Sequence, residues 1–194
     1  MIAGLERPSS GTIELKEICK LGMAFQYSAL FDSLTVAENI CFPLVVGENL
    51  EKEYSEEELS KLVKERLSLV GLAGIEDQYP SELSGGMKKR ISFARAVVHD
   101  PGLVLYDEPT AGLDPVASTM VEDLILKLQK EVKASAILVT HQFSTIQRAS
   151  DRVIMLHGGH IVWHGTPDEL FNSSDPYATQ FRDGNPDGPM KVQN

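Results

Sequence analysis

Residues 83–114 read LSGGMKKRISFARAVVHDPGLVLYDEPTAGLD, and this stretch decides the fold that the rest of the chain must complete. Two glycines open a segment of helical spacing, an apolar strand follows, and two acids stand directly after that strand. The stability of the fold does not require two acids, Asp107 and Glu108, at the end of the most apolar strand. We therefore expect this strand end to handle a metal ion and a nucleophilic water.

Strands and helices alternate on both sides of this stretch. Strands are predicted at residues 12–15, 21–25, 102–106 and 136–140, and a hairpin at 152–156 and 161–165. Helices are predicted to follow Thr35, Ser55, Ser84, Asp114 and Thr166. Continuously apolar strands that alternate with helices indicate a parallel α/β sheet with helices on both faces.

Local signals fix where several of these helices begin. Thr35 is a predicted N-cap, Ser55 and Glu58 form a predicted capping box, and Asp114 is a cap followed by proline. The helix after Asp114 is expected to bury its apolar residues, which are Met120, Val121, Leu124, Ile125 and Leu128.

Composition bounds the class of protein. The 194 residues suffice for one domain with a core, and 42% hydrophobic and 24% charged residues are ordinary for a soluble protein. A net charge of −10 argues against a non-specific nucleic-acid binder. Cys19 and Cys41 make neither a disulfide framework nor a metal cluster, and we see no secretory signal or membrane-spanning run. We expect an intracellular protein that meets a membrane only through a partner.

Polar residues follow three predicted strands. Gln26, the pair Asp107 and Glu108, and His141 all stand at carboxyl ends, where such sheets bind ligands. One acid could hold Mg²⁺ and the other could polarise water, while Ser84-Gly85-Gly86 could receive a phosphate at a helix N-terminus. Taken singly, these features also fit a capped turn, a structural histidine or a loop cap. Their order and spacing together favour phosphoryl transfer.

Five ordered motifs resemble the nucleotide-binding domains of ABC ATPases over nearly the whole chain. Leu83–Met87 resembles the signature, Gly102–Glu108 the Walker B strand with its glutamate, and Ala111–Asp114 the D-loop. His141 resembles the switch histidine and Gln26 the Q-loop glutamine. The resemblance implies an α/β fold, a P-loop NTPase-like parallel sheet flanked by helices, with a helical signature subdomain at about 33–98. It places the ATPase domain at 1–181 and a C-terminal tail at 182–194.

The resemblance also implies roles for single residues. ATP would lie between two such subunits, with Ser84, Gly85, Gly86, Gln26 and Asp114 among its binding residues. Asp107 and Gln26 would serve Mg²⁺, while Glu108 would act on the attacking water and His141 on the γ-phosphate. Implied partners are a second ABC ATPase subunit, identical or not, and transmembrane permease subunits that dock near the segment after Gln26. The implied location is the cytoplasmic face of the plasma membrane or the stromal face of a plastid envelope.

A narrower resemblance concerns the cargo. Met87 stands where most of the family has glutamine, and this resembles the ATPases of Mla-, Mce- and TGD-type lipid importers. Phe181–Pro189 also resembles the ending of Mla ATPases, and the alternative for this tail is a disordered end. The implied cargo is a phospholipid or a related lipid.

The chain departs from the family in one motif. No G-x-x-x-x-G-K-[ST] loop is present, and only residues 16–20 stand between two predicted strands where the family has a longer stretch. We expect weak ATP binding by the chain alone and a tendency to aggregate. The alternatives are a truncated ATPase, a degenerate subunit that lends its signature to an intact partner, and a non-transport ABC ATPase.

Overall fold

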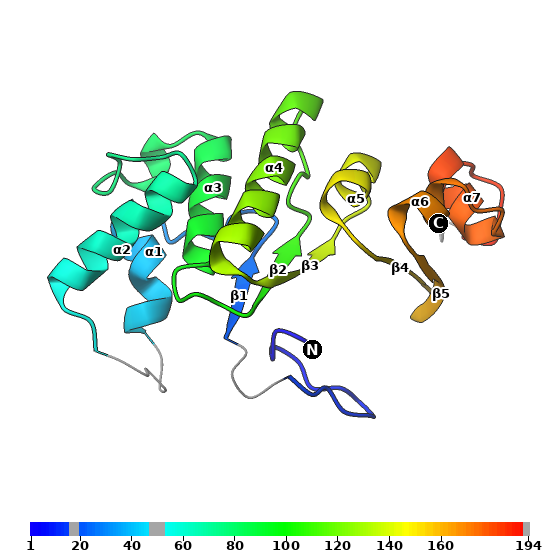
Figure 1. Ribbon diagram of the computed structural model, residues 1–194, viewed down its shortest axis with the longest axis horizontal. Coiled ribbons are helices and arrows are strands. Elements are labelled where there is room, and N and C mark those ends of the chain that lie inside the picture. Colours follow the sequence, from blue (N-terminus) through cyan, green and yellow to red (C-terminus); the bar gives the residue numbers. More distant parts are fainter. Residues whose placement is uncertain (16–19, 47–52, 192–194) are drawn as a thin grey trace. The chain divides into compact units, whose positions relative to one another are not determined.

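The computed structural model describes residues 1–15, 20–46 and 53–191. The chain divides into two compact units, Met1–Thr140 and His141–Asn194. Figure 1 shows the helices and strands of both units. The shortened stretch at residues 16–20 lies almost wholly outside the described residues, and so does part of the acidic segment 48–58.

The first unit is built on a parallel sheet. Its strands are β1 (Leu21–Ala24), β2 (Leu103–Asp107) and β3 (Ser135–Val139), in that order. Leu21 is in register with Leu103, and Leu103 with Ser135, so all three strands end at the same edge. The parallel strands predicted at 21–25, 102–106 and 136–140 are therefore confirmed.

Five helical segments belong to the same unit. They are α1 (Val36–Val45), α2 (Glu56–Leu69), the 3₁₀ turn η1 (Pro80–Glu82), α3 (Gly85–Ala96) and α4 (Pro115–Val132). The predicted caps are confirmed: Thr35 and Ser55 each accept from the N3 amide, and Asp114 accepts from two amides of α4. The described part of 33–98 contains α1, α2, η1 and α3 and no strand.

One hydrophobic cluster contains buried residues of the four helices α1, α2, α3 and α4 and of the buried face of the sheet. Phe93 of α3 meets Tyr106 of β2 edge to face, with ring centroids 5.2 Å apart. At β1 the backbones themselves touch, because a Cβ on Gly22 would lie 2.0 Å from the Ala96 carbonyl oxygen. Helix α3 thus packs on β1 at Gly22 without room for a side chain between them.

The other face of the sheet is more open. Ile137 is 38% and Val139 60% exposed, and exposure alternates along β3 although its last four residues are all apolar. Met23 and Leu105, which share this face, are half-buried. The apolar character of β3 therefore does not mean that both of its faces are covered in this unit.

Two sequence predictions in this unit are wrong. Residues 12–15 form no strand, and Ile13 and Leu15 are exposed, since a strand needs a neighbour to pair its backbone groups. Met120 is 65% exposed, because the buried stripe of α4 runs through Val121, Ile125 and Leu128 at helical spacing.

The second unit has its own small core. Hairpin strands β4 (Val153–His157) and β5 (His160–Gly165) confirm the predicted hairpin, and α5 (Phe143–Ala149), α6 (Pro167–Phe171) and α7 (Pro176–Asp183) surround it. Buried residues of this core are Ile146, Met155, Leu170 and Ala178. The Trp163 ring lies over Gly165, where a Cβ would be 2.6 Å from the indole.

The polar tail begins inside a helix and folds back on it. Helix α7 extends through Arg182 and ends at Gly184, which has a positive φ of 61°. The Gln180 amide then donates to the Met190 carbonyl (2.9 Å) and accepts from the Met190 amide (2.7 Å). These two bonds return the chain end to α7. The domain bounds 1–181 and 182–194 stay predictions.

Candidate functional site

The end of β2 carries the two acids that the sequence singled out. Asp107 is the last residue of the strand, and Glu108 follows with a φ of 42°, in the left-handed region. Its amide donates to the Val139 carbonyl (2.9 Å), and its carbonyl accepts from the Ala111 amide (3.1 Å). The Thr140 hydroxyl donates to the Glu108 carboxylate at 3.4 Å. Backbone bonds thus hold a conformation that costs a non-glycine residue about 1–2 kcal/mol.

The loop after β2, residues 108–114, ends in the cap of α4. One carboxylate oxygen of Asp114 accepts from the amides of Val116 (2.9 Å) and Ala117 (3.0 Å). Pro115 begins the helix, where its missing N–H leaves no bond unmade. Asp114 therefore has a structural task, and its predicted contact with ATP stays a prediction.

The loop after β1, residues 25–35, carries Gln26 in a tight turn. The Ser28 amide donates to the Phe25 carbonyl (3.0 Å), which places Gln26 and Tyr27 at the two central positions of the turn. Ser28 and Ala29 both have positive φ, 64° and 46°. Gln26 is half-buried two residues beyond β1, and β1 pairs directly with β2, so Gln26 and Asp107 follow neighbouring strands.

Buried polar side chains from outside this loop hold it in place. The Arg95 guanidinium donates to the carbonyls of Ala29 (2.8 Å) and Ser28 (2.9 Å). The Asn39 amide donates to the carbonyls of Phe31, Leu34 and Thr35 and accepts from the Phe31 amide. Asn39 is fully buried and Arg95 is 7% exposed, so solvent does not compete for these bonds.

The signature residues lie at the start of α3. Ser84 is the N-cap, and its hydroxyl accepts from the Met87 amide at 3.3 Å. Gly85 and Gly86 are exposed, and a Cβ on either would meet nothing within 4 Å. The first helical turn therefore offers backbone N–H groups and the positive end of the helix dipole to an approaching anion.

One turn further along α3, Lys89 joins this helix to the loop after β2. Its ammonium donates to the Ala111 carbonyl at 3.5 Å, the outer limit for such a bond, and the residue is 5% exposed. Burial lowers the pKa of the Lys89 ammonium, and the nearby Glu108 carboxylate raises it in part. The positive charge of Lys89 thus faces the region of Glu108.

His141 is the first residue of the second unit and precedes α5. Its side chain is exposed. The structure therefore brings Gln26, Asp107 and Glu108 to neighbouring strand ends of the first unit. The role of His141 toward a phosphate stays a prediction.

The donor set fits a magnesium nucleotide. Asp107 and Glu108 offer carboxylate oxygens and Gln26 an amide oxygen, the hard ligands that Mg²⁺ prefers. No group of three or more His, Cys, Asp or Glu side chains poised to hold a metal occurs in the described ranges. Mg²⁺ commonly keeps several waters and binds through one or two carboxylates plus phosphates.

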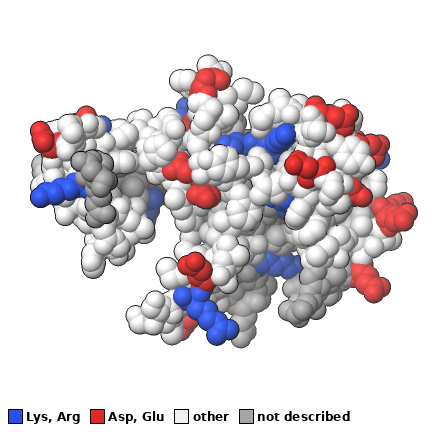
Figure 2. Space-filling view, turned by 180° about the vertical axis from the view of Figure 1, so that it is seen from behind, with Lys and Arg blue, Asp and Glu red and all other residues white. Residues whose placement is uncertain are grey.

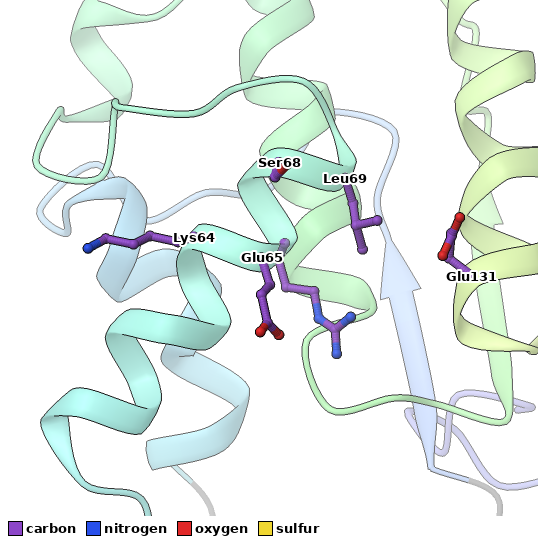
Figure 3. A pocket seen from close by; sticks show the side chains of 6 residues that line it. Lys64, Glu65, Ser68, Leu69 and Glu131 are labelled. Carbon is purple, nitrogen blue, oxygen red and sulfur yellow. The ribbon is translucent and has the colours of Figure 1, made fainter.

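A hollow of the first unit lies away from the strand ends. It has a volume of about 520 Å³ and is lined by α2 residues 64–66, 68 and 69 and by Glu131 of α4 (Figure 3). Lys127 of α4 donates to the Leu69 carbonyl (2.8 Å) and ties these helices together. The hollow is open and carries none of the motif residues.

Charge on the visible surface is mixed. On the face shown in Figure 2, Lys and Arg side chains lie scattered among acidic ones. A nucleic-acid-binding surface usually gathers its basic residues on one face or along one helix. The described residues also contain no helix with the length and apolarity to cross a bilayer.

Sequence reasoning missed Asn39, Lys89 and Arg95 as builders of the site. Arg95 follows Ile91 by four positions, which puts it on the buried face of α3. A charged residue on an apolar helix face was therefore a readable signal. Asn39 in VAENI carried no such signal, because its three carbonyl partners come from a loop without regular structure.

Comparison with known proteins agrees with this geometry. A family profile described as ABC transporter matches residues 1–111. The chain is 43% identical over 220 aligned residues to Protein TRIGALACTOSYLDIACYLGLYCEROL 3, chloroplastic, of Arabidopsis thaliana, covering 98% of this chain and 63% of that protein. It is 38% identical to the probable ribonucleotide transport ATP-binding protein mkl of Mycobacterium tuberculosis, covering 97% of this chain and 55% of that protein.

A solved structure shares the fold as well. The ATP-binding cassette MJ0796, in a dimeric post-hydrolysis state bound to ADP and Pi, superposes with a TM-score of 0.66 at 30% identity. The match covers 77% of this chain and 63% of that one. The predicted P-loop NTPase-like fold is confirmed, and the chain belongs to the ABC transporter ATP-binding family. It spans 55% to 63% of the length of the two curated relatives described above.

Proposed function

We propose that this chain is the ATP-binding and ATP-hydrolysing subunit of an ABC transporter that moves a phospholipid or a related lipid. The observation that carries the proposal is Glu108, held in a left-handed conformation directly after Asp107 at a strand end. A non-glycine residue that backbone bonds hold in a left-handed conformation is typical of a functional site. Gln26 follows the neighbouring strand and completes a set of oxygen ligands.

In this proposal each residue has one task. Bound Mg²⁺-ATP would supply the phosphoryl group and the metal that neutralises its charge. Asp107 and Gln26 hold the metal through oxygen atoms. Glu108 orients the attacking water and accepts its proton at a carboxylate oxygen. Ser84, Gly85 and Gly86 receive phosphate oxygens through the N-terminus of α3, and Asp114 and His141 lie beside the nucleotide.

The proposed assembly has two kinds of partner. A second ABC ATPase subunit would share two nucleotides with this chain, each lying between a signature and a strand-end site. Transmembrane permease subunits would dock near the loop after β1, where Tyr27 is 86% exposed. The chain would then lie at the cytoplasmic face of a plasma membrane or the stromal face of a plastid envelope.

The first experiment measures ATP hydrolysis by the protein isolated from its own cells with its co-purifying subunits, because the 194 residues carry no P-loop motif. Glu108→Gln is expected to lower kcat by about 100-fold or more while ATP still binds. Glu65→Gln, at an exposed position of α2, is the matched control and should leave the rate unchanged. If only a change at Ser84 stops hydrolysis, the chain is a signature-lending subunit.

A second experiment identifies the cargo. The chloroplastic relative, the methionine at Met87 and the tail at Phe181–Pro189 support a lipid, whereas the name of the mkl relative refers to ribonucleotide transport. Phospholipid vesicles and ribonucleotides are added separately to the isolated complex. Stimulated hydrolysis by vesicles, with phospholipid recovered from the complex, is expected. Stimulation by ribonucleotides alone would replace the lipid.

A further inference from the structure

We propose that Arg95 is a positioning residue for Gln26 and links the signature helix to the metal-binding turn of the same subunit. The proposal rests on the function proposed above and names a residue outside the motifs. Arg95 lies in the last turn of α3, the helix that begins with Ser84. Its guanidinium reaches a loop 66 and 67 residues earlier in the chain.

The two contacts fall at the place where the loop is most strained. Arg95 bonds the carbonyls of Ser28 and Ala29, which are adjacent non-glycine residues with φ of 64° and 46°. Ser28 also closes the turn around Gln26 through its amide. A planar guanidinium can meet two neighbouring carbonyls at fixed spacing, so it selects this backbone conformation.

The guanidinium of Arg95 makes its described hydrogen bonds only to this loop. Among the described residues no carboxylate forms an ion pair with Arg95, and both of its described hydrogen bonds go to backbone carbonyls. Burial lowers the pKa of the guanidinium, which stays charged because its ordinary pKa lies far above neutrality. The two carbonyl oxygens stabilise the buried guanidinium of Arg95. The guanidinium in turn stabilises the backbone conformation of Ser28 and Ala29.

Helix α3 can pass on a displacement because it is docked rigidly. The backbone contact between Gly22 and Ala96 leaves no gap between α3 and β1. A movement of the signature at the start of α3 therefore reaches Arg95 and, through it, the turn that carries Gln26. In an ATP dimer the signature faces the partner's nucleotide, so Arg95 would connect one nucleotide site to the other.

The matched control is Arg66 of α2. Arg66 is 8% exposed and bonds Asp100 at 2.7 Å, and Asp100 also has a positive φ, 50°. It therefore holds a strained residue as Arg95 does, in a loop that carries no motif. Arg66→Lys reports the general effect of weakening a buried arginine.

The test measures ATP hydrolysis at varied ATP and varied Mg²⁺ in the protein isolated from its own cells with its co-purifying subunits. Arg95→Met is expected to lower kcat about tenfold and to raise the Mg²⁺ concentration for half-maximal rate, with the KM for ATP within about twofold. Arg95→Lys should recover part of both effects. Arg66→Lys should leave the Mg²⁺ dependence unchanged.

Hydrogen exchange supplies a second readout should Arg95→Met fold poorly. In Arg95→Lys, faster exchange is expected for the amides of residues 25–31. Unchanged exchange together with unchanged Mg²⁺ dependence would overturn the role of Arg95 and leave the proposed function standing. Absence of ATP hydrolysis in the unaltered protein would overturn both.

Discussion

The loops that follow β1 and β2 leave the same edge of one sheet, and both hold non-glycine residues at positive φ. They differ in what holds them. Residues 25–35 depend on Arg95 and Asn39, two buried side chains from helices. Residues 108–114 are held by backbone bonds to β3 and within the loop, and Lys89 of α3 adds one long bond to the Ala111 carbonyl. The first loop therefore depends more on helix side chains, whereas the second depends more on the sheet beside it.

The largest effect is expected from Gly22→Val, which disrupts the backbone contact between β1 and α3 at Gly22 and Ala96. Its Cβ would clash with the Ala96 carbonyl, so α3 must move away from β1 and take Arg95 with it. The free energy of unfolding should fall by about 3 kcal/mol, as in other overpacked sites. Urea denaturation measures this loss. Ser135→Val, at an exposed position of the same sheet, is the control and should change stability little.

Asn39→Ala removes hydrogen bonds to the first loop and leaves the contact between Gly22 and Ala96 in place. It removes three donated bonds and one accepted bond from a fully buried side chain, and leaves carbonyls unsatisfied. A loss of about 2 kcal/mol is expected. Hydrogen exchange should quicken at residues 31–35 and stay slow at Glu108 and Ala111. Equal acceleration in both loops would mean that they are not held independently. Asn172→Ala, which loses one exposed bond, is the control.

Asp114→Ala tests the end of the second loop. Loss of the two capping bonds should destabilise α4 by about 1 kcal/mol, seen as a lower thermal midpoint. Asp114→Asn keeps the cap and should keep the midpoint. If Asp114→Asn nevertheless lowers ATP hydrolysis, Asp114 has the predicted role at the nucleotide in addition to the cap.

The smallest effect concerns the strain at Glu108. Glu108→Gly should be more stable than Glu108→Ala by about 0.5 kcal/mol, because glycine adopts a left-handed conformation without the steric penalty but gains entropy when unfolded. Both variants remove the carboxylate and should be equally inactive. Chemical denaturation of the pair measures the difference. A more stable Glu108→Ala would mean that this loop is not strained.

Much of the fold was readable because its signals are local. Helical spacing, the Ser55–Glu58 capping box and the Asp114-Pro115 pair each act within one turn, and the structure confirms the helices they predicted. The strand predicted at residues 12–15 failed because a strand exists only with a neighbour, and local composition says nothing about that neighbour. The exposed face of β3 is hidden in its sequence for the same reason.

The site was readable where it follows strand ends and unreadable where it depends on distant contacts. Gln26, Asp107 and Glu108 could be placed together because parallel strands end at one edge. The left-handed φ of Glu108 could not be predicted, since the bond from its amide reaches Val139, 31 residues later. The hydrogen bond from Arg95 to the Ser28 carbonyl likewise depends on the packing of α3 against β1.

Each unit contains a residue whose environment reports its unfolding, and in the second unit this residue is Trp163, which lies over Gly165. Trp163 is the only tryptophan in the sequence and lies in the second unit, so its fluorescence follows the unfolding of that unit alone. The first unit carries Cys41, whose thiol pKa burial raises to about 11 and which stays unreactive at neutral pH until α1 opens. Tryptophan fluorescence and labelling of the Cys41 thiol, followed in one denaturation series of a Cys19→Ser variant, therefore show whether the two units unfold together or separately.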